Sequence, residues 1–334
     1  MTDRVRLAYV GCGAISPMHT FGIEQSGAPI DVVACIDPDE GVARATAEPF
    51  GAAVHGSLTE AILAGGFDAV DIMVPHQLTE HVSAEAFDAG LHVLLEKPMA
   101  TSLEGCERIL DRAGSSNGVF MVAENSQYWP DVVAVGDAIT SGLIGDVVTA
   151  RATFFIPPLD DFYGGDAPWR FDEGATTHGI AVDTGSHWIR PLRMWLGEVA
   201  EVVGHTARPF ESMAGESLAL ALLRFESGVV ATLDGLLTAA ALGPQPLFRV
   251  TGSIGELTID ASGAVTVYND EHRRGDVIAE TGGYLNSYAG EFADFADAVL
   301  NGESPAAGPE QAVEDLKVAF ALYRSVKSAT WERP

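Results

Sequence analysis

The sequence predicts an α/β protein with a doubly wound parallel sheet in its N-terminal part and an α+β domain with a mostly antiparallel open sheet behind it. Up to about residue 125, short apolar runs alternate with helical patterns, which is typical of repeated βαβ units. Beyond that point, longer alternating runs end in glycine-containing turns. Because 334 residues exceed one small core, we expect two domains, 1–125 and 126–334.

The predicted parallel strands are Leu7–Val10, Val32–Ile36, Ala69–Val74, His92–Leu95 and Val119–Val122. Turns or helical patterns follow them, among them Ser83–Ala89 and Leu103–Ala113. Right-handed crossovers between parallel strands would place helices on both faces of the sheet.

A linking helix is expected near Asp131–Ser141, before a second set of strands. These are Val147–Phe155, Ser217–Phe225, Val229–Leu236, Leu257–Asp260 and Ala264–Tyr268. Gly228 and Gly263 stand where a short hairpin needs a positive φ. Helical patterns at Ser287–Leu300 and Gln311–Ser328 close the chain, the latter a candidate to pack back on the first domain.

Composition narrows the class of protein. The formal charge of −28 disfavours partners such as nucleic acid and anionic membrane surfaces. No run of 18 apolar residues and no signal segment is evident, and the three cysteines form no even disulfide framework. We therefore expect a cytoplasmic protein.

A glycine-rich string, Gly11 to Ser16, follows the first strand and opens a helical pattern. Gly11 permits a tight turn, and Gly13 lets a pyrophosphate approach the backbone. Ala14 and Ile15 lead into a helix whose free N–H groups attract anions. Ser16 replaces the third glycine, so the match to a dinucleotide-binding (Rossmann) turn is partial.

Asp37 ends the second strand at the distance expected for a residue that binds the adenosine ribose. Its carboxylate would accept hydrogen bonds from the ribose hydroxyls and would repel a 2′-phosphate. The sequence thus predicts a preference for NAD over NADP.

One of only three lysines, Lys97, follows the strand His92–Leu95 in the string Glu96-Lys97-Pro98. Ligands of open α/β folds bind beyond the carboxyl ends of the strands. A salt bridge between Glu96 and Lys97 is disfavoured, since adjacent strand residues point to opposite faces. Lys97 is therefore a candidate functional residue.

These features together resemble the glucose-fructose oxidoreductase and inositol dehydrogenase family, written Gfo/Idh/MocA, over nearly the whole chain. The motifs that carry the resemblance are Gly11-Cys12-Gly13, Glu96-Lys97-Pro98, Glu124-Asn125 before Tyr128, Trp169-Arg170, and Asp183-Thr184-Gly185-Ser186-His187. The resemblance implies that Lys97, Asp183 and His187 form the reacting group. It also implies that Pro75 and His76, like Glu96 and Lys97, face the cofactor.

The residue types agree with that chemistry. Asp183 and His187 are four apart and would share one helix face. An imidazole suits the removal of a hydroxyl proton as hydride leaves carbon, so His187 is the expected general base. Lys97 would stabilise negative charge on the reacting oxygen, although some family members assign the proton transfer to the lysine. A zinc site of His178, Asp183 and His187 lacks convincing spacing, and no metal is expected.

Five further residues are candidates for binding substrate. An indole face can stack on a sugar, and a guanidinium or amide can bind its hydroxyls. The candidates are Asn125, Tyr128, Trp169, Arg170 and His178. His178 stands where relatives often carry a glycine-rich run. A histidine there would change the shape of the substrate pocket, so the sequence does not predict one specific substrate.

The predicted function is hydride transfer between nicotinamide and a secondary hydroxyl or ketone of a cyclitol, sugar or modified sugar. Two alternatives stay open: a redox-neutral, glycosidase-like enzyme that uses NAD, and a nucleotide-sensing regulator without chemistry. An apolar antiparallel face that needs covering also suggests a homo-oligomer, a dimer or tetramer.

Overall fold

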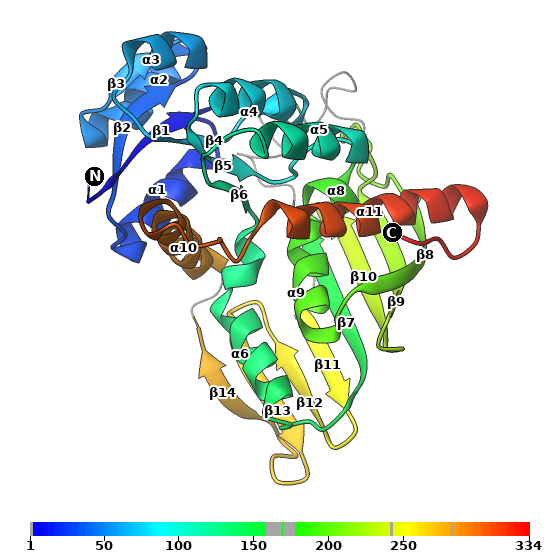
Figure 1. Ribbon diagram of the computed structural model, residues 1–334. Coiled ribbons are helices and arrows are strands. Elements are labelled where there is room, and N and C mark those ends of the chain that lie inside the picture. The colour runs from blue at the N-terminus through cyan, green and yellow to red at the C-terminus, as the bar shows by residue number, and fades with distance from the viewer. Residues whose placement is uncertain (1–2, 158–168, 170–177, 241–242, 282–283) are drawn as a thin grey trace. The chain divides into compact units, whose positions relative to one another are not determined.

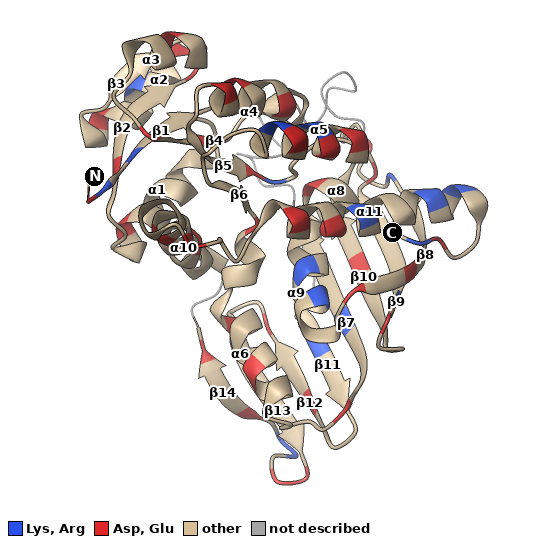
Figure 2. Ribbon diagram, viewed as in Figure 1, with Lys and Arg blue, Asp and Glu red and all other residues tan. Residues whose placement is uncertain are grey.

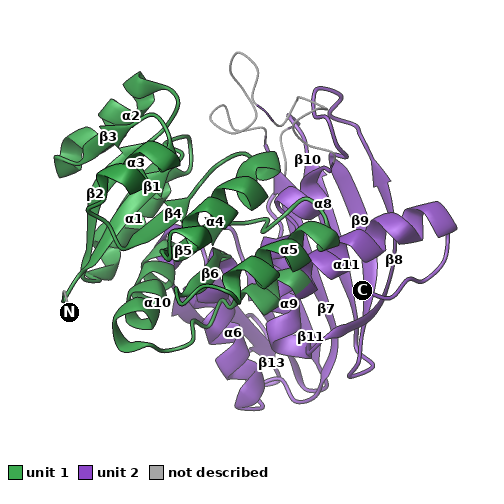
Figure 3. Ribbon diagram, turned by 45° about the horizontal axis from the view of Figure 1, so that its top comes forward, with its two compact units in different colours: residues 1–124, 288–313 green, residues 125–287, 314–334 purple. Residues whose placement is uncertain are grey.

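The computed structural model describes residues 3–157, 169, 178–240, 243–281 and 284–334 (Figure 1). The chain forms two compact units, coloured in Figure 3: unit 1 has residues 1–124 and 288–313, and unit 2 has 125–287 and 314–334. The domain predicted over 126–334 therefore lacks residues 288–313, which belong to unit 1. The segment from 288 joins unit 1 because Tyr288 and Phe292 pack directly over Gly22, leaving no room for a Cβ there.

Unit 1 contains a six-stranded parallel sheet in the order β3-β2-β1-β4-β5-β6. The strands are β1 (Val5–Val10), β2 (Ile30–Ile36), β3 (Ala53–His55), β4 (Ala69–Ile72), β5 (His92–Glu96) and β6 (Phe120–Ala123). The five predicted strands are confirmed with shifted ends. The short edge strand β3 was missed.

Unit 1 contains helices of which three begin at a capping side chain. The helices are α1 (Ser16–Ser26), α2 (Glu40–Ala47), α3 (Leu58–Ala64), α4 (Thr79–Asp88), α5 (Leu103–Ala113) and α10 (Ser287–Asn301), with short 3₁₀ turns η1 (Glu48–Phe50) and η2 (His76–Leu78). The side chains of Asp39, Ser57 and Ser102 accept backbone N–H groups at the starts of α2, α3 and α5. These caps fix where each crossover leaves its loop.

Unit 2 is built on an eight-stranded sheet in the order β14-β13-β12-β11-β7-β10-β9-β8. Its strands are β7 (Val147–Ile156), β8 (Val199–Ala207), β9 (Leu218–Phe225), β10 (Val230–Leu237), β11 (Phe248–Gly252), β12 (Gly255–Ile259), β13 (Ala264–Asn269) and β14 (Asp276–Glu280). Among the described strand pairs of this sheet, only β7 and β10 are parallel, which confirms the mostly antiparallel sheet. Gly228 and Gly263 have φ of 86° and 80°, as their hairpins require.

Helices cover one face of this sheet (Figure 1). They are α6 (Pro130–Thr140), α8 (Ile180–Asp183), α9 (Ser186–Leu196) and α11 (Pro309–Ser328), with 3₁₀ turns η3 (Asn125–Tyr128) and η5 (Tyr284–Asn286). The Phe154 ring of β7 stacks on Trp188 of α9, with centroids 5.4 Å apart and planes 8° apart. Gly235 of β10 makes room for Phe154, because a Cβ there would lie 2.2 Å from the ring.

Two arginines of α9 share one carboxylate inside unit 2, and Figure 2 shows their helix as a basic stretch. Arg190 Nε donates to Asp315 Oδ2 at 2.8 Å, and Arg193 Nη1 donates to Asp315 Oδ1 at 2.5 Å. All three side chains are at most 2% exposed. The pairing lets α9 and α11 bury charge between them.

The other face of the unit 2 sheet exposes apolar side chains. Along β9, Leu220 and Leu222 point outward, whereas Ala221 and Leu223 are buried.

Among the described helices, none has the length and apolarity needed to cross a membrane.

Candidate active site

The glycine-rich turn follows β1 at the point where the strand order of the unit 1 sheet reverses. Gly11 has φ of 92°, and a Cβ there would lie 2.5 Å from the carbonyl oxygen of Met73, just after β4. Only glycine fits this conformation at this distance. Gly13 has open space on its Cβ side. The turn therefore leaves backbone accessible where dinucleotides bind in such folds.

The start of α1 fits an anionic ligand. Ser16, at the position of the third glycine, is buried, and its hydroxyl donates to the Gly13 carbonyl at 2.9 Å. No side chain of the described residues caps the helix at Ile15, and its first turn carries no acidic residue. The positive end of the helix dipole thus faces no negative side chain of its own first turn.

Asp37 lies beside this turn. Its Oδ2 accepts the Cys12 N–H and its Oδ1 accepts the Asp39 N–H, each at 2.9 Å. The carboxylate is half-buried and bonded to the turn itself. It stands at the end of β2, where sequence analysis placed the ribose-binding acid.

The other predicted cofactor residues reach the same edge of the sheet. Pro75 and His76 come soon after β4, and Lys97 comes directly after β5. Because all strands of this sheet run parallel, their carboxyl ends share one edge with the glycine turn. His76 is buried and Lys97 is partly exposed.

The structure corrects the prediction that Asp183 and His187 share one helix face. Asp183 ends α8, and His187 lies in the first turn of α9. The helix breaks at Gly185. A Cβ on Gly185 would lie 2.2 Å from the carbonyl oxygen of Ala181, so only glycine fits there. The four-residue spacing therefore spans two short helices, and both side chains are still buried, at 4% and 8% exposure.

Aromatic side chains surround His187 within unit 2. Its ring centroid lies 6.2 Å from those of Trp129 and Tyr284, and those two rings are 5.6 Å apart in an edge-to-face arrangement. Sequence reasoning missed both aromatics, because neither belongs to a motif. Flat apolar faces beside an imidazole suit the C–H surface of a sugar ring.

Glu216 holds the start of α8, and sequence reasoning missed it as well. Its Oε2 accepts the Gly179 N–H and its Oε1 accepts the Ala181 N–H, each at 2.9 Å. The Tyr323 hydroxyl of α11 donates to Oε1 at 2.8 Å. Burial raises the pKa of Glu216, while these hydrogen bonds oppose the rise. The contacts fix the segment that ends in Asp183.

The predicted substrate residues have different surroundings. Asn125 is buried and donates to the Ser287 hydroxyl at 3.0 Å, while Tyr128 and Trp169 are partly exposed. His178 stacks on Tyr323, with centroids 5.2 Å apart, and burial lowers its pKa. Arg170 lies outside the described residues.

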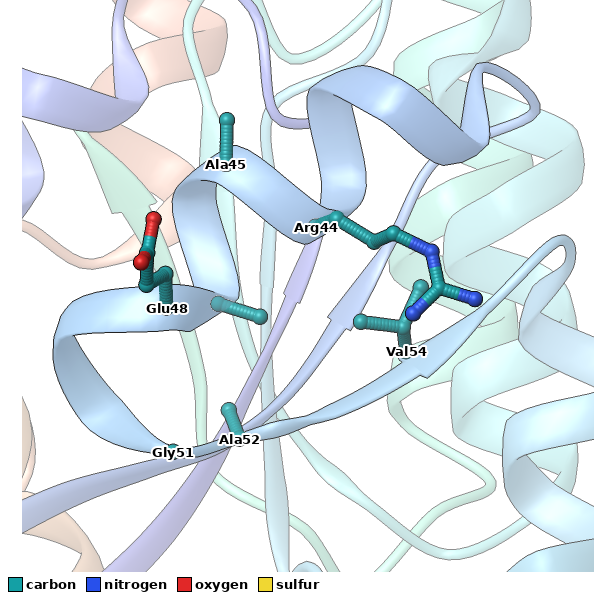
Figure 4. Close-up of a pocket in the computed structure, with 7 residues that line it drawn as sticks. Arg44, Ala45, Glu48, Gly51, Ala52 and Val54 are labelled. Atoms are coloured by element: carbon teal, nitrogen blue, oxygen red, sulfur yellow. The ribbon is translucent and has the colours of Figure 1, made fainter.

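A surface hollow lies at the outer edge of the unit 1 sheet (Figure 4). Its lining comes from α2, η1 and β3 and the residues beside them: Arg44, Ala45, Ala47, Glu48, Gly51, Ala52 and Val54. None of the predicted site residues lines it, and we assign it no role.

Comparison with known proteins agrees with this arrangement. Residues 5–124 match a family model described as an oxidoreductase family with an NAD-binding Rossmann fold, and residues 132–258 match a GFO/IDH/MocA C-terminal domain. A D-apiose dehydrogenase of Paraburkholderia graminis is 28% identical over 81% of this chain and 72% of its own. A D-xylose 1-dehydrogenase (NADP(+)) of Haloferax volcanii is 26% identical over 89% and 90%.

A solved structure shares the fold. It is an oxidoreductase from Agrobacterium radiobacter in complex with NAD⁺, L-tartaric acid and magnesium, with a TM-score of 0.87 and 21% identity over 99% of this chain and 98% of that one. The two family models together span most of the chain, in the order that the two sheets follow. The protein is therefore an oxidoreductase of the Gfo/Idh/MocA family with an NAD-binding Rossmann domain.

Proposed function

We propose that this protein transfers hydride between NAD and a secondary hydroxyl or ketone of a sugar, cyclitol or modified sugar. The observation that carries the proposal is the single sheet edge in unit 1 that presents the Gly11 turn, Asp37 and Lys97 together. Relatives named as sugar dehydrogenases support the substrate class. In this proposal unit 1 binds the cofactor and unit 2 contributes the substrate-binding residues.

The residues have distinct proposed roles. Bound nicotinamide would supply the chemistry of hydride exchange. Lys97 would donate a hydrogen bond to the reacting oxygen and stabilise its negative charge. His187 would hold the hydroxyl proton, and Asp183 would bind a neighbouring hydroxyl. The rings of Trp129 and Tyr284 would exclude water from the imidazole.

We propose NAD as the preferred cofactor. Asp37 already accepts two backbone N–H groups, so its charge is held beside the turn where a 2′-phosphate of NADP would approach. A relative named for NADP(+) shows that other members choose differently. A panel of aldoses, ketoses and inositols, run with NAD and with NADP and followed at the nicotinamide absorbance, tests both proposals. Silence across the panel, or faster turnover with NADP, would contradict them.

Two substitutions test the reacting group. We expect Lys97→Ala and His187→Ala each to lower turnover by roughly 100-fold or more, since a positioned acid or base contributes about that much. Lys327→Ala and His81→Ala are matched controls, because both side chains are exposed. Full turnover in both site variants would refute the assignment, provided that circular dichroism shows folded protein.

We also propose a homodimer or homotetramer that works in the cytoplasm. The outward Leu220 and Leu222 support an assembly in which a second copy covers this sheet face. Light scattering should give a multiple of the chain mass, and Leu222→Glu should reduce it. A monomeric wild-type protein would contradict the assembly.

A further inference from the structure

A histidine with no exposed surface lies between two carboxylates in unit 1. His19, in α1, places Nδ1 2.7 Å from Asp71 Oδ2 and Nε2 3.2 Å from Glu96 Oε1. His19 and Asp71 are fully buried, and the Glu96 side chain is 13% exposed. Asp71 lies in the central strand β4, and Glu96 is the last residue of β5.

The contacts favour a doubly protonated ring. An ionised carboxylate only accepts hydrogen bonds, so each ring nitrogen of His19 needs a hydrogen to face its partner. Burial opposes the charge, but Asp71 and Glu96 outweigh it and raise the pKa of His19 well above its usual value. One imidazolium thus donates a hydrogen bond to each of two carboxylates.

The surrounding groups keep this charge away from water. Tyr288 and Phe292 of α10 pack on the ring, with centroids 5.6 Å and 5.3 Å from that of His19. Two further acids face the cluster: Glu291 of α10 and Glu124 after β6. Burial raises the pKa of Glu291 well above its usual range and raises the pKa of Asp71 as well. His19 is the basic group that contacts both Asp71 and Glu96.

We propose that His19, by bridging Asp71 and Glu96, is a positioning residue for Lys97. The helix that carries His19 starts at the glycine turn, and Glu96 directly precedes Lys97, so the two bonds tie the turn to the end of β5. The inference rests on the proposed function, in which Lys97 contacts the reacting oxygen. His19 itself would touch neither substrate nor cofactor.

A double-mutant cycle tests the route through Glu96. His19→Gln and Glu96→Gln should each lower kcat at least about tenfold, since small misplacements of reacting groups are costly. The double variant should be no slower than the slower single variant, because both changes break the same link. The NADH affinity of His19→Gln, measured by fluorescence, should change less than about threefold, because His19 itself does not touch the cofactor. His81→Gln, at an exposed histidine of α4, should leave kcat unchanged.

Multiplicative losses in the double variant, or an unchanged kcat in His19→Gln, would overturn the inference. If His19→Gln does not fold, Glu96→Gln still carries the test: an unchanged kcat there contradicts it. Nitrogen NMR of the wild-type imidazole at pH 7 adds a readout independent of activity, and we expect both ring nitrogens of His19 to be protonated. A ring with one bare nitrogen would contradict the bridge.

The experiments distinguish failure of the proposed function from failure of the positioning role. Normal turnover in Lys97→Ala would remove that function and leave the NMR result standing. Loss of turnover in Lys97→Ala together with a normal kcat in His19→Gln would refute the positioning role alone.

Discussion

The buried carboxylates of the two units differ in how many hydrogen-bond and ion-pair partners they have. In unit 2, Asp315 receives two guanidinium groups, and Glu216 receives two backbone N–H groups and a hydroxyl. In unit 1, Asp71 and Glu96 share one imidazole, and Glu291 has both oxygens buried without a hydrogen bond to any residue that the structure describes. Acids in unit 2 hold helices in place, whereas those in unit 1 lie beside the strand ends at a cost in stability.

Asp315→Ala tests whether a buried carboxylate of unit 2 stabilises the fold, and it has the largest expected effect. It removes the carboxylate shared by two buried arginines, and we expect a loss of about 3–5 kcal/mol in the free energy of unfolding. Urea denaturation measures it. Asp270→Ala, in an exposed pair with Arg273, should cost less than about 1 kcal/mol. Equal costs for both variants would erase the distinction.

A smaller loss is expected for Glu216→Gln. The amide can keep its oxygen toward Ala181 and Tyr323, but its NH₂ would then face the Gly179 N–H, donor against donor. We expect about 1–3 kcal/mol, the usual cost of a lost buried hydrogen bond. Glu314→Gln, on the partly exposed side of α11, is the matched control. A Glu216→Gln variant as stable as wild type would show that the carboxylate does not hold α8.

For the buried Glu291 of unit 1, we expect removal of the carboxyl to raise the free energy of unfolding instead of lowering it. Burial raises the folded pKa of Glu291, so below the unfolded pKa both states are protonated and stability does not depend on this group's titration. As the pH rises from the unfolded pKa toward the folded pKa, the wild type loses stability. Glu291→Gln avoids this loss. Its advantage over wild type should grow by about 1.4 kcal/mol for each pH unit between the unfolded pKa, roughly 4.3, and the raised folded pKa. Thermal unfolding from pH 5 to pH 7 measures the trend, and a pH-independent difference would contradict it.

Much of the fold could be predicted because its strands carry clear patterns. β9 alternates buried and exposed residues, and β4 is buried throughout. The missed strands carry weaker signals: β3 has three residues, β14 is almost wholly exposed and β8 does not alternate strictly. β11 alternates, but over five residues only, and it was missed as well. Local patterns predict an element only when one of its faces is buried against its neighbours.

The site was less accessible to sequence reasoning. Gly11 and Asp37 stand at motif distances from a predicted strand, and the structure joins them through the Cys12 N–H. His19 and Glu216 carry no local signal, since their partners lie 52 and 107 residues away in the chain. Gly185, where the helix breaks, lies too close to the Ala181 carbonyl for a Cβ, and spacing alone cannot reveal this contact.

The stack of Phe154 on Trp188 also bears on how this protein can vary. Gly235 leaves no space for a methyl group beneath Phe154, and Trp188 is the direct neighbour of His187. A larger residue at 235 would push one ring into the next and shift the imidazole. Position 235 therefore tolerates no side chain without a shift of the aromatic rings next to His187.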